Sequence, residues 1–225
     1  MKLATLLATI LLTAAAWGQL YFVNTGHSQA RTIDAFWQLN PHQLPLPLDH
    51  LRTVNHDSFK CARLVQFQDA DARFIEMWHR PDVMLLWNGD VDVEHETPTA
   101  QWIACAQQYL DGWLARWPGV VLLVPNVTID SRATTGAPSY FSQQMPALNA
   151  EYNAALAALS PQYACNGVYA GCVIPLDVKT MTTLQSGPDM GWGNPTMLYI
   201  DTLTPGSQVV SMIVRNKLAM VIARR

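Results

Sequence analysis

The chain has 225 residues, of which 50% are hydrophobic and 14% are charged, and its net charge is −3. This length suits a single domain with a substantial core, and the high apolar content argues against intrinsic disorder. The 14 lysines and arginines are scattered without a basic run, so we do not expect a nucleic-acid-binding surface.

The first segment, residues 1–18, has the features of a signal peptide. Lys2 gives a minimal positive start, residues 3–16 are apolar or small throughout, and Ala16-Trp17-Gly18 supplies small residues before a cleavage site. The alternative is a membrane anchor, but the apolar run is shorter than the roughly 20 residues that a bilayer requires. We therefore expect a secreted, extracellular protein with one domain at 19–225 and no stable membrane insertion.

After residue 18, short apolar runs alternate with helix-like stretches. The expected strands are Leu20–Val23, Leu51–Val54, Asp82–Trp87, Gly119–Val124 and Cys172–Leu176. The expected helices are Ser28–Leu39, Phe59–His79, Thr99–Trp117, Pro146–Leu159 and Pro205–Ala223. This alternation predicts a three-layer α/β/α fold around a mostly parallel sheet of about five strands. Such a sheet places its functional site at the carboxyl ends of the strands.

The sequence contains four cysteines, an even number that suggests disulfides in an oxidising compartment. Cys165 and Cys172 are close in sequence and bracket two glycines, so we expect them to close a small loop. That leaves Cys61 with Cys105, a pair that requires two predicted helices to be neighbours. Two buried free thiols are the alternative for this second pair. Asn126-Val127-Thr128 is a glycosylation sequon and is consistent with a secretory route.

Polar motifs follow several of the predicted strands. In chain order they are Gly26-His27-Ser28, Asn55-His56-Asp57-Ser58, Asn88-Gly89-Asp90 and, before the last helix, Asp201-Thr202-Leu203-Thr204. A serine at a helix N-terminus lies beside the positive end of the helix dipole and beside free backbone N–H groups, which can stabilise an oxyanion. On this feature alone, the more common role of a serine in the position of Ser28 is to cap the helix N-terminus.

In order, spacing and total length these motifs resemble the SGNH (GDSL-type) hydrolases over nearly all of residues 19–225. That family has Gly-Asp-Ser after the first strand, a glycine after the second, Gly-x-Asn-Asp after the third and Asp-x-x-His before the last helix. The resemblance implies a flavodoxin-like sheet and an ester hydrolase that uses no cofactor or metal and acts on an acyl ester or O-acyl glycan. It implies Ser28 as the nucleophile and Asp201 in the catalytic set. The oxyanion donors would be the N–H of Ser28 and a group at Asn88 or Gly89.

The chain departs from the family pattern at several of these positions. His27 replaces the aspartate beside the serine, Asp57 or Ser58 falls at the position of the second glycine, and Asn88 lies one residue from its expected register. Thr204 stands where the family has its catalytic histidine. Threonine cannot act as a general base near neutral pH, so catalysis is impaired unless another residue takes the proton.

The six histidines all lie at or before residue 95. His56 and His95 follow the second and third predicted strands, so they are the candidates for a substitute base. His27 adjoins Ser28, but neighbouring side chains at a helix start usually point apart. The remaining three are expected at the surface: His42, His50 and His79.

Two other functions remain open. The first is a non-catalytic SGNH-like protein, a pseudoenzyme that binds a glycan or lipid ester in the retained cleft. Its candidate aromatic contacts are Trp87, Trp102, Trp192 and Tyr199. The second is an α/β-hydrolase, because Gly26-His27-Ser28-Gln29-Ala30 is similar to the Gly-x-Ser-x-Gly elbow of that family. That family needs a late histidine, which is missing, and its elbow does not come so early in the chain.

Overall fold

The computed structural model describes residues 20–43, 48–128, 145–179 and 205–224. Over these ranges the strands form one sheet with the order β2-β1-β3-β4-β5. Their bounds are β1 (Phe22–Gly26), β2 (Leu51–Asn55), β3 (Val83–Trp87), β4 (Val121–Pro125) and β5 (Cys172–Leu176). Every neighbouring pair is parallel, so the predicted α/β class and flavodoxin-like order are confirmed. The sheet is entirely parallel rather than mostly parallel.

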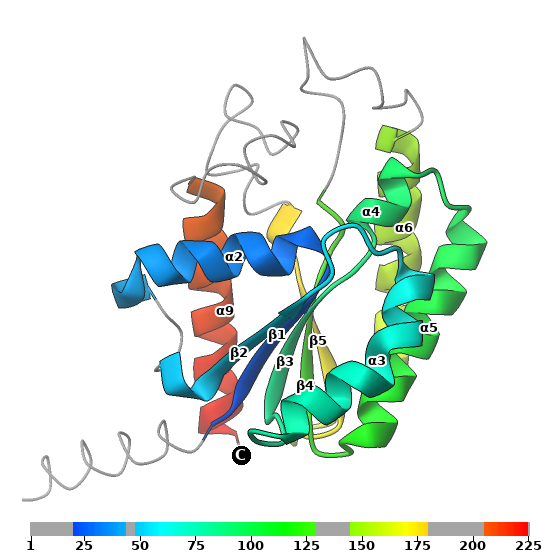
Figure 1. Cartoon of the computed structure of the whole chain (residues 1–225). Helices are drawn as coiled ribbons and strands as arrows, with labels where there is room; N and C mark the ends of the chain where they lie inside the picture. Colours follow the sequence, from blue (N-terminus) through cyan, green and yellow to red (C-terminus); the bar gives the residue numbers. More distant parts are fainter. Residues whose placement is uncertain (1–19, 44–47, 129–144, 180–204, 225) are drawn as a thin grey trace, which may run out of the picture.

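Helices cover both faces of this sheet (Figure 1). On one face lie α2 (Ser28–Leu39) and α9 (Pro205–Ala223), and on the other lie α3 (Cys61–Glu76), α5 (Thr99–Arg116) and α6 (Met145–Leu159). Short helices occur at α4 (Asp90–Glu94), η1 (Pro41–Gln43), η2 (Leu48–His50) and η4 (Ser160–Tyr163). Two hydrophobic clusters, one on each side of the sheet, form the core.

The two strands β3 and β4 form where the sequence offers apolar runs without charge, whereas β2 includes Arg52 and is only partly buried. All five residues of β3 and of β4 are buried, as expected for parallel strands covered on both faces. The expected strand was Leu20–Val23. Strand β1 begins two residues later, at Phe22, and continues to Gly26, so it includes the polar Asn24. Asn24 Oδ1 accepts a hydrogen bond from Trp87 Nε1 at 3.1 Å, and its Nδ2 donates to the Ala30 carbonyl at 2.7 Å. These bonds allow a polar side chain to be fully buried in a central strand.

Both predicted disulfides are present. Cys61–Cys105 joins α3 to α5 with a Cα–Cα distance of 6.0 Å, and Cys165–Cys172 closes the short loop before β5 with a distance of 5.0 Å. The two bonds are compatible with an extracellular protein. In the described ranges no helix has the length and apolar character needed to cross a membrane.

Several residues of the sequence prediction lie outside the described ranges. They are the signal peptide at 1–18 and the positions Asp201, Thr204, Trp192 and Tyr199.

Candidate functional site

Strands β2, β1 and β3 end at one edge of the sheet. Gly26, the last residue of β1, is in register with Asn55 on one side and with Trp87 on the other. The motifs that begin at His27, at His56 and at Asn88 therefore leave the sheet together. Gly26 has a φ of +130°, and a Cβ there would lie 2.0 Å from the Trp87 carbonyl oxygen, so only glycine fits this crossing point.

Ser28 is the first residue of α2, as the sequence predicted. It is not the N-cap, because His27 holds that position and its side chain accepts a hydrogen bond from the Gln29 N–H. Ser28 is 6% exposed. Within the described residues its backbone N–H and its hydroxyl donate to no atom, which leaves an N–H donor at the positive end of the helix.

The imidazole of His27 forms a hydrogen bond through Nδ1 only, and its buried Nε2 has no hydrogen-bond partner within the described residues. Nδ1 accepts from the Gln29 N–H at 3.3 Å, and Nε2 lies 3.4 Å from Asp90 Oδ2. Since Nδ1 is an acceptor, the neutral ring carries its proton on Nε2, facing the Asp90 carboxylate at a long separation. Burial lowers the pKa of His27, and the Asp90 charge opposes that shift. His27 therefore has no free lone pair with which to take a proton from Ser28.

The partner carboxylate, Asp90, ties three strand ends together. It begins α4 after β3 and is 2% exposed. Its Oδ1 accepts from the backbone N–H of Thr128 at 2.8 Å, and the Thr128 hydroxyl lies 3.3 Å from both carboxylate oxygens. Thr128 follows β4 and is fully buried. The chain from His27 through Asp90 to Thr128 thus fixes the ends of β1, β3 and β4 relative to one another.

The glycosylation sequon falls on this same segment. The amide of Asn126 donates to Asp177 Oδ1 at 2.8 Å and its carbonyl oxygen accepts from the Lys179 N–H at 2.9 Å. The sequon's threonine is the buried Thr128. Glycosylation at Asn126 stays a prediction.

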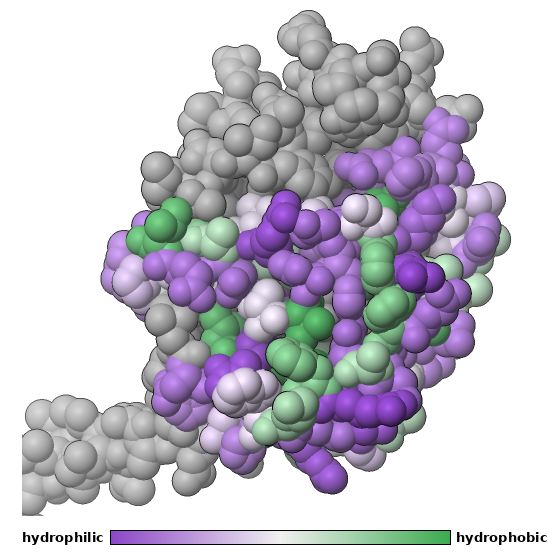
Figure 2. Space-filling view, viewed as in Figure 1, coloured by the Kyte–Doolittle hydropathy of each residue, from purple (hydrophilic) through white to green (hydrophobic). Residues whose placement is uncertain are grey.

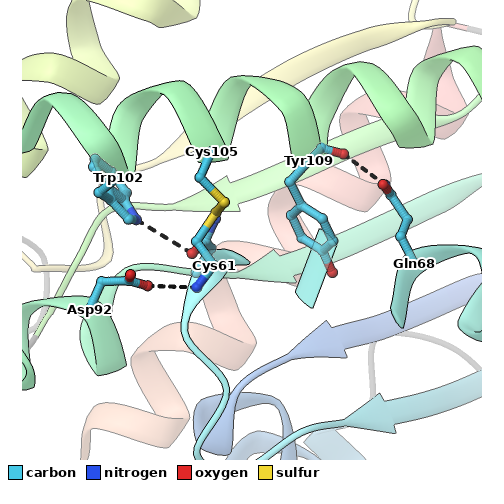
Figure 3. Close-up of a disulfide and its surroundings, with 7 residues drawn as sticks. Cys61, Gln68, Asp92, Trp102, Cys105 and Tyr109 are labelled. Atoms are coloured by element: carbon cyan, nitrogen blue, oxygen red, sulfur yellow. Dashed lines mark hydrogen bonds between the residues drawn. A yellow bond between two sulfur atoms is a disulfide. The ribbon is translucent and has the colours of Figure 1, made fainter. Parts of the chain in front are cut away.

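The side chain of Asn88 is directed toward the helices rather than toward Ser28. Its Nδ2 donates to Cys61 Sγ at 3.3 Å, and its Oδ1 accepts from Trp102 Nε1 at 3.4 Å. The disulfide of Cys61 lies in the α3–α5 layer, where Asp92 also accepts from the Cys61 N–H (Figure 3). A role for Asn88 as an oxyanion donor stays a prediction, and in this conformation its amide is already occupied.

Gly89 is the alternative donor at this strand end. Within the described residues its N–H, like that of Ser28, donates to no atom. Its φ is +111°, and a Cβ would lie 2.6 Å from Val127 Cγ2 and 3.0 Å from the Trp102 ring. Any larger residue at position 89, such as asparagine, would displace Val127. This position therefore offers only backbone groups to a ligand.

His56 forms a histidine–carboxylate pair with Asp71 of α3. Its Nε2 lies 2.9 Å from Asp71 Oδ2 and 3.1 Å from Oδ1, and its ring stacks on Phe59 with centroids 4.7 Å apart. Burial raises the pKa of the Asp71 carboxyl, and the contact with His56 opposes that rise. The backbone N–H of His56 donates to the Gly26 carbonyl at 2.8 Å, and Arg31 of α2 pairs with Asp57. These contacts hold the loop after β2 against the start of α2.

Asp71 was missed by the sequence analysis, although the sequence carries a signal for it. A charged residue stands on the buried stripe of α3, beside Leu64, Ala72 and Ile75. A buried carboxylate requires a partner, and here the partner is His56.

The other predicted site residues are not gathered at Ser28. All six histidines are described, and within the described residues none forms a hydrogen bond with Ser28. His95 is exposed at the end of α4, and His42 and His79 are exposed, as predicted. His50 is partly buried at the surface: its side chain is 14% exposed and its ring lies against Tyr21.

The aromatic contacts proposed for a binding protein are partly excluded as well. Trp87 is 2% exposed and Trp102 is 1% exposed, so both belong to the core. No group of three or more His, Cys, Asp or Glu in the described ranges is placed to hold a metal ion.

Comparison with known proteins gives a likeness in structure only. No family model and no curated protein matches the sequence. An acetyl esterase, solved as a serine-to-alanine mutant with an acetate ion, is 14% identical and superposes with a TM-score of 0.58 over 91% of this chain and 99% of that chain. A carbohydrate esterase family 3 protein from Talaromyces cellulolyticus is also 14% identical, with a TM-score of 0.57 over the same shares.

These likenesses establish the class of fold. The chain shares the α/β fold of these two esterases, with Ser28 and the Gly89 loop at the carboxyl ends of its strands.

Proposed function

We propose that this protein is an extracellular ester hydrolase that removes short acyl groups, such as acetyl, from an O-acylated glycan or a similar small ester, with Ser28 as the nucleophile. One observation carries the proposal: the N–H groups of Ser28 and Gly89 are both unpaired within the described residues, at adjacent strand ends. The fold adds support, since it is shared with an acetyl esterase and a carbohydrate esterase. Two fixed backbone donors beside a nucleophile are what an acyl-transfer site requires.

His56 is the proposed base. Asp71 holds the Nε2 side of the ring, which fixes the proton on Nε2 and leaves Nδ1 as the acceptor. The backbone N–H of His56 donates to the carbonyl of Gly26, so the loop that starts at His56 runs beside His27-Ser28. His95 has less support, because it is exposed and no described carboxylate orients it through a hydrogen bond.

The proposed reaction has two steps. Ser28 Oγ attacks the acyl carbonyl while its proton passes to His56 Nδ1, and the N–H groups of Ser28 and Gly89 hold the oxyanion. The intermediate collapses, the leaving alcohol takes the proton back from His56, and an acyl group remains on Ser28. Water then attacks the acyl-serine and gives a proton to His56. His56 returns that proton to Ser28 Oγ, which releases the carboxylic acid and restores the serine hydroxyl.

Hydrolysis of 4-nitrophenyl acetate and of an acetylated xylose by the purified protein tests this function. We expect Ser28→Ala to lower kcat/KM by about 1,000-fold or more. Ser58→Ala is the matched control, because Ser58 is an exposed serine in the neighbouring loop, and it should leave turnover unchanged. Turnover that survives Ser28→Ala contradicts the proposal.

A non-catalytic binding protein is the second candidate. It is favoured by the finding that none of the six histidines is hydrogen-bonded to Ser28 within the described residues. Its test is Thr204→His, which puts the family's histidine back at its expected position. If the natural protein is inactive and Thr204→His hydrolyses the aryl ester through Ser28, the cleft is intact and the binding function is preferred.

A further inference from the structure

A pocket lies at the amino-terminal ends of the strands, opposite the strand ends that carry Ser28. Its cavity volume is about 210 Å³, and it is lined by Tyr21, Phe22, Val23, Asp49, His50, Arg52, Trp78 and His79. These residues come from the start of β1, from η2 and the start of β2, and from the turn that follows α3. Because β1 is five residues long, its first and last Cα atoms are about 13 Å apart. The pocket is therefore separate from the carboxyl-edge site.

Aromatic rings form one wall of the pocket. The rings of Tyr21 and His79 stack with centroids 3.7 Å apart and an interplanar angle of 12°, and His50 lies 5.2 Å from Tyr21 on another side. Trp78 is 56% exposed, and the Arg52 guanidinium lies 4.6 Å from its ring centroid. An indole that is this exposed offers a flat apolar surface to a ligand.

The surface beside the pocket is also apolar. Phe74 of α3 and Met77, which follows that helix directly, are 48% and 77% exposed. On the face drawn in Figure 2, hydrophobic residues gather over the region of β2 and α3, and most of the surrounding surface is hydrophilic. Trp78 of the pocket is thus followed along the chain by polar residues but preceded by Met77 and Phe74, whose apolar side chains are also exposed.

Polar groups of both kinds stand in the same pocket. Arg52 donates from Nη1 to the Leu51 carbonyl at 2.7 Å, and within the described residues no carboxylate lies within 4.0 Å of its guanidinium. Its remaining N–H groups are therefore available as donors. Asp49 supplies acceptors: Oδ1 contacts His50 Nδ1 at 2.9 Å, and the side chain is 75% exposed. That contact with His50 lowers the pKa of Asp49, so Asp49 is ionised at neutral pH.

We propose that this pocket binds one sugar ring of an uncharged oligosaccharide. A sugar ring has an apolar face, which suits the exposed indole of Trp78, and hydroxyls that both donate and accept. Arg52 and Asp49 together match such hydroxyls. The charges of Asp49 and Arg52 are opposite and act on each other, so this pair gives the pocket no net positive charge with which to favour an anionic ligand. The site is independent of the proposed esterase function, since no residue of the Ser28 edge takes part.

Isothermal titration calorimetry with xylohexaose, cellohexaose and mannohexaose, beside polygalacturonate as the anionic comparison, tests the proposal. We expect at least one neutral hexasaccharide to bind with a Kd of about 1 mM or tighter. Trp78→Ala should weaken that binding by about tenfold or more. Asp49→Asn, at an exposed position that needs no repacking, should also weaken it. Phe74→Ala is the matched control, an exposed aromatic outside the pocket, and should bind as the natural protein does.

Ser28→Ala separates this site from the carboxyl edge. Unchanged affinity in Ser28→Ala and unchanged 4-nitrophenyl acetate turnover in Trp78→Ala support a separate sugar site. The proposal is overturned if none of the neutral hexasaccharides binds at about 10 mM, or if only polygalacturonate binds. It is also overturned if Phe74→Ala weakens binding as much as Trp78→Ala does.

Discussion

His27 Nε2 lies 3.4 Å from Asp90 Oδ2, and the two side chains are 1% and 2% exposed. This contact joins the end of β1 to the end of β3 immediately beside Ser28. A neutral imidazole is compatible with a buried carboxylate, whereas a second carboxylate at position 27 would repel it. A histidine at position 27, where the SGNH hydrolases have an aspartate, therefore fits a site in which Asp90 is held by Thr128.

The buried His27 predicts a loss of stability in mild acid. Burial lowers the folded-state pKa of His27 below its usual 6.5, so between these two values the unfolded chain binds more protons than the folded one. The free energy of unfolding is then greatest above about pH 6.5 and falls as the pH falls toward the folded-state pKa. Urea unfolding at about pH 8 and about pH 5.5 measures this slope.

His27→Asn is the comparison for that experiment. Asparagine also caps helices by accepting from a backbone N–H, but it does not titrate in this range. We expect a flatter dependence of unfolding free energy on pH in the variant. An equal slope in both proteins would show that other groups cause the effect.

Gly89→Ala should reduce both stability and turnover. The new Cβ would lie 2.6 Å from Val127 Cγ2, at a φ of +111° that L-residues rarely adopt. We expect a loss of about 1–3 kcal/mol in unfolding free energy, together with lower kcat because the Gly89 N–H moves. Gly119→Ala is the control, since a Cβ there meets nothing within 4 Å. Equal losses in the two variants would mean that the effect is not local to the Gly89 loop.

The His56–Asp71 pair should act on kcat. His56→Gln removes the proposed base, and we expect kcat for 4-nitrophenyl acetate to fall by about 100-fold or more with little change in KM. Asp71→Asn keeps the shape but weakens the orientation of the ring, so a smaller fall of about tenfold follows. Asp69→Asn, at an exposed carboxylate of the same helix, should change neither constant. A change in KM alone would assign His56 to binding rather than to proton transfer.

The two disulfides should differ in what they contribute to stability. Cys61 and Cys105 are 44 residues apart in sequence, and Cys165 and Cys172 are 7 apart. Closing the longer loop restricts the unfolded chain more, so replacing the first pair by serine should cost about 3–4 kcal/mol and replacing the second pair clearly less. Urea unfolding of the two double variants gives the comparison, and a larger loss from Cys165 and Cys172 would contradict this loop-length effect.

Sequence patterns predicted the elements that are long or uniformly apolar. The helix Ser28–Leu39 and the strand Cys172–Leu176 have the expected bounds, because a periodic stripe and a continuous apolar run are local properties. The end of β1 was misplaced, since Asn24 looks like a loop residue until its partners on Trp87 and Ala30 are known. Helix α4 was not expected, because Asp90–Glu94 alternates apolar and polar residues and has no helical period.

For the candidate site, the sequence predicted which motifs meet at the ends of the strands but not the contacts among their side chains. The order of the motifs was enough to gather Ser28, His56 and Gly89 at one edge. The partners of His56 and of Asp90 were not predictable, because Asp71 and Thr128 reach them from elements distant in sequence. Which way a side chain turns, such as Asn88 toward the Cys61 disulfide, depends on packing that no local pattern encodes.

The most direct test of the central claim is covalent labelling of the nucleophile. The purified protein is incubated with a fluorophosphonate, which reacts with activated serines, and its peptides are analysed by mass spectrometry. We predict a phosphonyl adduct on Ser28 that is absent in Ser28→Ala and reduced in His56→Gln. No adduct on Ser28, in protein that is folded by circular dichroism, would contradict the assignment of Ser28 as an activated nucleophile.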